Sequence, residues 1–212
     1  MGFSTLIDIL GSTIIGGLLL LILLRMNDTA VENNYLFSGE KIVQQNLLDI
    51  VRLIEYDFTK IGYCKDWTKI PDPAKAIISA TDTSISFLTD VAVSQGNLEG
   101  DGVPDTLKYY LGTKEELSST PNPNDRILYR VVNNQTARGS NLGVTQFKLT
   151  YFDALGDTLH PNEMPASPPL GICTIQIDVA VENPAAYGDD YSSERKVIWR
   201  QIRLAARNLK TR

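Results

Sequence analysis

The sequence predicts an α+β fold in which one long N-terminal helix packs on an antiparallel β-sheet head. Two observations support this prediction. The chain opens with an apolar run that passes into an amphipathic stretch of helical period. Residues 64–212 consist instead of short runs that alternate apolar and polar side chains, separated by clusters of Gly, Pro, Asn and Asp. The expected organisation is therefore an apolar helix segment at 1–26, an amphipathic helix segment at 27–63, and a β-rich head at 64–212.

The apolar run over residues 6–24 is long enough to cross a bilayer, which takes about 20 helical residues. The first basic residue, Arg25, stands at its far end, and no small-residue cleavage site follows. A cleavable secretory signal therefore fits badly. Asp8 lies inside the apolar segment, where an unpaired carboxylate costs about 2.5 kcal/mol or more. Either Asp8 stays hydrated near the membrane surface, or it has a partner.

Apolar side chains recur at helical spacing through the amphipathic segment, while charged and amide residues fill the other face. The apolar stripe consists of Val43, Leu47, Ile50, Val51, Ile54, Phe58 and Ile61. Ser38 and Gly39 predict a bend or break in the helix, and Gly62 predicts its end. The stripe must lie on a core, which the head supplies.

The head contains a series of predicted strands. In the run at 171–183, Ile175, Ile177 and Val179 fall on one side with Cys173, and polar side chains fall on the other. Such alternation predicts a sheet with one buried face. The predicted strands lie at 75–90 (two strands split by a turn at Thr81 and Asp82), 105–112, 126–134, 143–156, 171–183 and 195–209.

No motif supports catalysis. The chain has one histidine, His160, beside a proline in a loop, and it offers neither a phosphate-binding glycine loop nor a zinc spacing. We therefore expect no enzyme. The formal net charge is -5 and basic residues are interspersed with acids, which indicates no nucleic-acid partner.

The two cysteines, Cys64 and Cys173, leave two alternatives open. Cys64 follows the predicted helix end and Cys173 lies on the apolar side of a strand, so the two are compatible with contact between helix and sheet. Outside the cytoplasm they can form a disulfide, which would stabilise the head by roughly 2–4 kcal/mol. The other alternative is two buried free thiols.

The stretch "GNLEGDGVPDTLKYY" has the spacing of a calcium loop, in which alternate side chains point toward a hard cation and a glycine permits the sharp turn. Lys108 stands where a helix–loop–helix hand has a bidentate glutamate, so a short extracellular type of loop is expected. The alternative is a polar hairpin turn. The predicted Ca²⁺ ligands are the side chains of Asn97, Glu99, Asp101 and Asp105 and the carbonyl of Val103.

The opening "GFSTLIDILGSTIIGGLLLL" resembles the start of type IV pilin-like proteins, particularly minor pilins and the minor pseudopilins of type II secretion. "NLLDIVRLIEYDFTKIGYC" resembles the end of the long helix in their larger subunits. "ILYRVVN", "GVTQFKLTYFDALG" and "IRLAARNL" resemble their strands. The resemblance covers most of the chain and is strongest over its first 64 residues.

This resemblance implies a processing and assembly route. A prepilin peptidase would cut after Gly2, and Phe3 would become the methylated N-terminus. Asp8 would pair with the terminal amine of a neighbouring subunit, which gives a buried carboxylate its partner and sets the axial register. The protein would first be a single-pass inner-membrane protein with an extracytoplasmic head, and then part of a filament in the periplasm or on the cell surface.

The expected function is therefore that of a structural subunit, a minor pilin or pseudopilin, whose partners are other subunits of its kind. The alternative is a single-span, membrane-anchored extracytoplasmic β-domain that binds a partner or ligand and does not polymerise.

Overall fold

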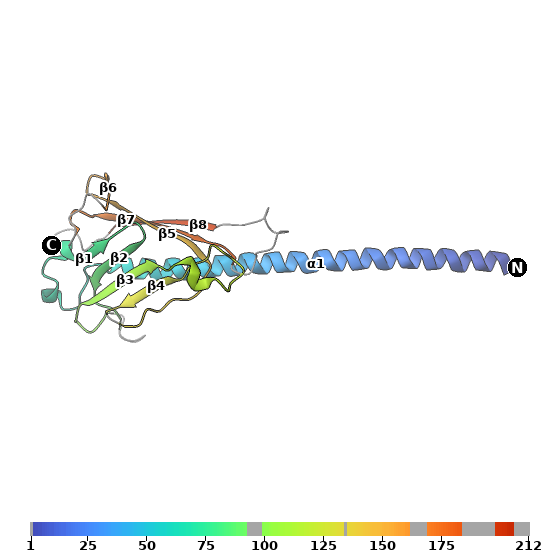
Figure 1. Ribbon diagram of the computed structural model, residues 1–212, viewed down its shortest axis with the longest axis horizontal. Helices are drawn as coiled ribbons and strands as arrows, with labels where there is room; N and C mark the ends of the chain where they lie inside the picture. Colours follow the sequence, from blue (N-terminus) through green and yellow to red (C-terminus); the bar gives the residue numbers. More distant parts are fainter. Residues whose placement is uncertain (1, 93–98, 134, 162–168, 184–197, 206–212) are drawn as a thin grey trace. The chain divides into compact units, whose positions relative to one another are not determined.

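The computed structural model describes residues 2–92, 99–133, 135–161, 169–183 and 198–205 (Figure 1). The chain forms two compact units, Met1–Lys41 and Ile42–Arg212. Helix α1 (Gly2–Thr59) contributes residues to both, and all the strands belong to the second unit. The predicted α+β class, with a long N-terminal helix and antiparallel strands, is confirmed.

Helix α1 is continuous, so it has no break at Ser38 and Gly39. Glycine costs only about 1 kcal/mol in a helix interior and serine less, which the neighbouring helical turns offset. The helix ends at Thr59, before the expected boundary at residue 63, and Gly62 lies in the turn that follows it. Gly62 has a φ of +73° and its N–H donates to the Leu88 carbonyl at 2.9 Å, so it redirects the chain as predicted.

Within the second unit, the predicted apolar stripe is buried, in α1 up to Phe58 and in the turn after it at Ile61. All of its members are at most 7% exposed: Val43, Leu47, Ile50, Val51, Ile54, Phe58 and Ile61. The Phe58 ring packs against the rings of Phe87 and Tyr109, with centroids 5.4 and 5.6 Å apart. Ile42 and Leu53 remain exposed on the other face of the helix. The amphipathic pattern thus predicted the packed face of the helix correctly.

The strands form two four-stranded antiparallel sheets where one sheet was expected. The first sheet has the order β1 (Ile77–Ala80), β2 (Ser84–Thr89), β3 (Asp105–Leu111), β4 (Leu128–Val132). The second has the order β6 (Thr158–Leu159), β5 (Val144–Phe152), β7 (Thr174–Val181), β8 (Ile198–Ala205). Each predicted run contains a strand, and the short β6 was not predicted.

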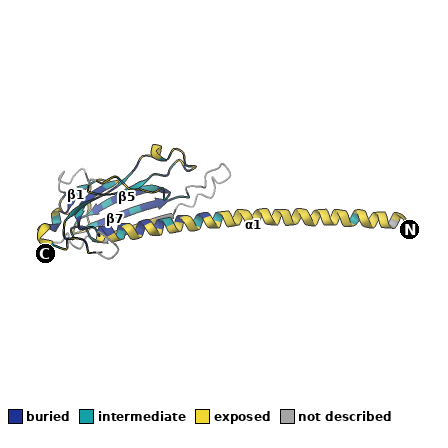
Figure 2. Ribbon diagram, turned by 90° about the horizontal axis from the view of Figure 1, so that it is seen from below, coloured by how far each residue is buried: buried dark blue, intermediate teal, exposed yellow. Residues whose placement is uncertain are grey.

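Both sheets contribute one face to the core. Ile175, Ile177, Val179 and Val181 of β7 are at most 1% exposed, as their alternation predicted. Figure 2 shows the buried faces of the strands in dark blue. Short 3₁₀ helices lie at Trp67–Lys69, Pro73–Lys75 and Lys114–Leu117.

A buried acid in the last turns of α1 was not predicted. Asp57 is 3% exposed and accepts hydrogen bonds from the Arg130 guanidinium and from the Tyr109 hydroxyl. Burial, together with the Asp57 charge, raises the pKa of Tyr109 well above its ordinary value. The group therefore joins the helix end to β3 and β4 through charged hydrogen bonds.

Candidate functional site

The first part of α1 exposes apolar side chains all the way round the helix. Every large apolar residue from Phe3 to Leu24 is at least 52% exposed. An 18-residue window of the helix has a mean hydropathy of 2.4 and is unburied, so by length and composition α1 can span a membrane. Figure 2 shows the contrast with the head, where the helix carries buried positions. A helix that is apolar on all sides needs lipid or other helices around it.

The predicted processing and assembly residues lie at the start of this segment. Gly2 is the first residue of α1, and Phe3 is 80% exposed. Asp8 is also exposed, and it forms no hydrogen bond or ion pair with any residue in the described part of the chain. Pairing of Asp8 with the terminal amine of another subunit therefore stays a prediction.

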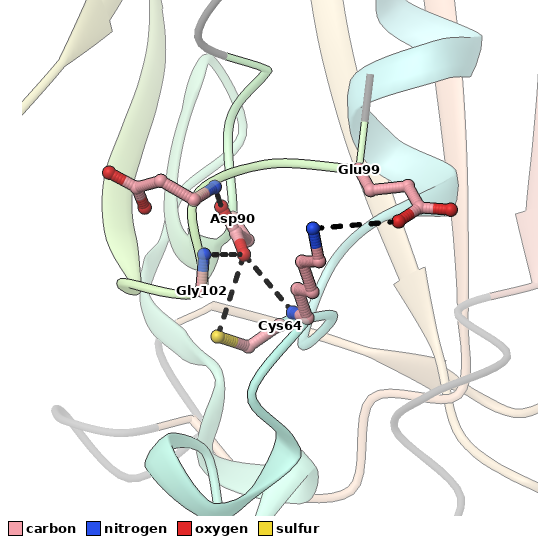
Figure 3. Close-up of polar contacts among 6 residues, drawn as sticks. Cys64, Asp90, Glu99 and Gly102 are labelled. Carbon is pink, nitrogen blue, oxygen red and sulfur yellow. Dashed lines mark hydrogen bonds and ion pairs between the residues drawn. The ribbon is translucent and has the colours of Figure 1, made fainter. Parts of the chain in front are cut away.

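The predicted calcium loop is organised by Asp90, a residue that the spacing argument missed. Its carboxylate is fully buried and accepts hydrogen bonds from the backbone N–H groups of Asp101 (3.0 Å), Gly102 (2.9 Å) and Lys65 (3.1 Å). The Cys64 thiol, 3.7 Å from Asp90 Oδ2, also donates to it. Figure 3 shows Asp90 at the centre of these contacts. Asp90 therefore fastens the loop to the segment that follows α1.

Gly100 is required for this arrangement. Its φ is +97°, and a Cβ built there would lie 1.8 Å from Asp90 Oδ1. Only a residue without a side chain lets the loop backbone approach the buried carboxylate this closely. The glycines around Asp101 were a sequence signal for a sharp turn, but they did not reveal its partner.

The described members of the predicted ligand set have separate partners. Glu99 forms an exposed ion pair with Lys65, with N and O 3.8 Å apart. Asp101 accepts from the Val103 N–H within its own turn. Asp105 accepts from the Val91 N–H and from Asn133.

These carboxylates do not converge. No group of three or more His, Cys, Asp or Glu side chains among the described residues is placed to hold a metal ion. Asn97 lies outside the described residues, so calcium binding by this loop stays a prediction.

The structure has both cysteines as free thiols, and a disulfide between them stays a prediction. Cys64 is 3% exposed, directs its Sγ toward Asp90, and has a pKa raised chiefly by burial. Cys173 is half-buried, and its backbone N–H donates to the Phe152 carbonyl.

No protein-family model matches the chain, and comparison with curated proteins gives no match. The class of protein is thus defined by the fold alone. It combines one N-terminal helix that is long and apolar enough to span a membrane with an antiparallel β head. This combination is compatible with a pilin-like architecture.

Proposed function

We propose that this protein is a structural subunit, a minor pilin or minor pseudopilin, of an envelope filament of the type IV pilus or type II secretion class. The observation that carries the proposal is the change in character along α1. Residues 3–24 are apolar on every side apart from one unpaired carboxylate, that of Asp8, whereas from Val43 onward one stripe is buried in the head's own core. The first part is therefore the part that needs a partner.

A membrane alone would cover the apolar side chains, but it would not favour Asp8. Lipid offers no counter-charge, whereas a bundle of helices can supply an amine to a buried carboxylate. The position of Asp8 thus favours a helix that leaves the membrane to pack with others. The role is structural rather than catalytic, and the partners are the inner membrane, a prepilin peptidase and other subunits.

Mass spectrometry of the native N-terminus tests the processing step. Cleavage after Gly2 with a methylated Phe3 supports the proposal. An intact N-terminus on protein recovered from filaments would contradict this part of it.

Substitution of Asp8 tests assembly. Asp8→Ala should insert into the membrane at least as well as the native chain, because removing a charge favours insertion. We expect it to be lost from the sheared filament fraction. Asp28→Ala, which removes another exposed acid of α1 beyond the apolar run, is the matched control and should assemble. Equal recovery of both variants in filaments would show that Asp8 is merely interfacial, whereas absence of the native chain itself from filaments would favour the alternative role of a non-polymerising anchored domain.

A further inference from the structure

Strand β8 has a long edge that is free within the described part of the chain. It pairs with β7 over its whole length, from Thr174 opposite Ala205 to Val181 opposite Ile198. On its other side, no backbone N–H or C=O of β8 has a hydrogen-bond partner in the described part of the chain. Alternate residues therefore direct their main-chain donors and acceptors outward, as a template for another strand.

The other sheet edges are short or covered. Strand β1 has four residues. Strand β6 pairs only with the end of β5, but farther along β5 the Leu149 N–H donates to the Asp82 carbonyl and the Val144 carbonyl accepts from the Arg126 N–H. The outer side of β4 forms a bridge between Arg130 and Arg138. Among the described strands, β8 is thus the one whose free edge extends over eight residues.

The charge on β8 is of one sign. The strand contains Arg200 and Arg203 and no acidic residue, and both arginines are exposed. Arg200 stands opposite the buried Val179 in the strand register, whereas Arg203 stands opposite Gln176. Residues directly opposite each other share a face of a sheet, so the strand carries one arginine on each face.

The Arg203 side chain is already held by two contacts within the head. Its guanidinium lies over the Phe152 ring, 4.8 Å from the centroid, and Nη2 donates to Gln176 Oε1 at 3.1 Å. These two contacts leave other guanidinium N–H groups available on the solvent face. A fixed guanidinium loses less conformational freedom when it binds a carboxylate.

We propose that the free edge of β8 binds an extended acidic segment of a partner chain by strand addition. Main-chain hydrogen bonds to the edge supply affinity, and the arginines select acidic side chains on the incoming strand. The inference is independent of the filament role, because it concerns only the head.

The test uses the full chain in detergent micelles and a fluorescent eight-residue peptide, Thr-Thr-Glu-Glu-Thr-Thr-Glu-Glu, which places two glutamates on each face of an extended strand. Fluorescence anisotropy measures the affinity. A peptide with lysine in place of glutamate should not bind. A peptide with the same charges but with every second amide N-methylated should bind at least tenfold more weakly, because it cannot complete the main-chain ladder.

Variants locate the site. R200E/R203E should weaken binding of the glutamate peptide about tenfold or more, since two attractions become repulsions. The milder R200Q/R203Q keeps polar side chains and should weaken binding about fivefold. K148E makes the same charge reversal at an exposed lysine of β5, away from the edge, and should leave the affinity within twofold of the native value.

Several results would overturn the proposal. If the glutamate peptide does not bind, the arginines serve only to prevent the β8 edge from pairing with other strands. Equal binding of the N-methylated peptide means charge attraction without strand addition. An equal loss in K148E and R200E/R203E places the attraction elsewhere on the sheet.

Discussion

Arg130 and Asp57 form a two-point ion pair between strand β4 and the last turns of helix α1. Arg130 Nε lies 2.6 Å from Asp57 Oδ2, and Nη2 lies 3.1 Å from Oδ1. The side chain of Asp57 is 4% exposed and that of Arg130 is 26% exposed. The pair therefore ties the helix end to the first sheet in a place where water screens the charges little.

Arg130→Ala should lower the free energy of unfolding by about 3 kcal/mol or more, because Asp57 stays buried without its counter-charge. Urea unfolding of a fragment beginning at Asn27 measures the effect. This fragment keeps the whole buried stripe of α1 and omits the apolar segment, so we expect it to be soluble and folded.

The matched control replaces both partners by apolar side chains, as in the double variant Asp57→Leu with Arg130→Met. It should cost less than Arg130→Ala alone, because no buried charge is left unpaired. A single-variant loss below about 1 kcal/mol, the value typical of surface pairs, would show that the pair does not behave as a buried one.

The head should lose stability in alkali through two buried tyrosines. Burial, with the nearby Asp57 charge, raises the pKa of Tyr109, and burial raises the pKa of Tyr151, whose hydroxyl donates to the Thr81 carbonyl. Above about pH 10 the unfolded chain releases these protons while the folded chain keeps them. The unfolded state then binds fewer protons, so the free energy of unfolding falls as pH rises, by up to about 1.4 kcal/mol per pH unit for each tyrosine.

Urea unfolding of the same fragment between pH 8 and 11 checks this slope. Tyr109→Phe and Tyr151→Phe should each flatten the profile above pH 10, whatever their cost at pH 8. Profiles that stay parallel to the native one would contradict the assignment to these residues.

Much of the fold was predictable because it depends on local periodicity. Six apolar positions at helical spacing identified the buried face of α1, and the alternation in β7 identified its core side. The features that were predicted wrongly or missed depend on tertiary context. Ser38 and Gly39 carry a weak local preference that a long helix overrides. The Asp57–Arg130 pair joins residues 73 positions apart, so no local pattern contains it.

In the predicted calcium loop, too, the local feature was predicted from sequence and the long-range contact was not. Gly102, the glycine of the calcium-loop spacing, correctly predicted a tight turn, and both Gly102 and the nearby Gly100 have positive φ. The spacing argument treated the turn as a closed set of ligands between Asn97 and Asp105. Its organiser is Asp90, at the end of β2, which looks from sequence like any polar residue after a strand. In the folded chain Asp90 is buried and its carboxylate is the main hydrogen-bond acceptor for the loop backbone.

The close approach of Gly100 to Asp90 predicts a large difference between two glycine substitutions. Gly100→Ala adds both positive-φ strain and a Cβ only 1.8 Å from Asp90 Oδ1. Gly156→Ala is the matched control, since its φ is +92° and nothing lies within 4 Å of its Cβ. Gly156→Ala should cost about 1–2 kcal/mol, and Gly100→Ala about 2 kcal/mol more, because the Asp90 hydrogen bonds must break. Similar midpoints for the two variants in urea unfolding would show that the Asp90 contacts contribute little.

The calcium prediction can be tested on the same fragment. If the loop binds Ca²⁺ through Asn97, Glu99, Asp101 and Asp105, the ion must replace the exposed contact of Glu99 with Lys65 and draw in Asp101, which now accepts within its own turn. Such rearrangement favours weak binding, in the 10⁻⁴ to 10⁻³ M range typical of extracellular modules. Calcium at about 100 times the dissociation constant would then add roughly 2.7 kcal/mol to the stability of the head.

Thermal unfolding with calcium and with chelator measures this increment. Asp101→Ala should abolish the increment, and the midpoint in chelator isolates the separate cost of losing the Val103 hydrogen bond. Asp153→Ala is the control, because Asp153 makes the equivalent bond to the Leu155 N–H in the loop before β6, outside the predicted ligand set. It should lose stability while keeping the full calcium increment. Equal midpoints for the native fragment in calcium and in chelator would leave this loop as a turn held by Asp90 alone.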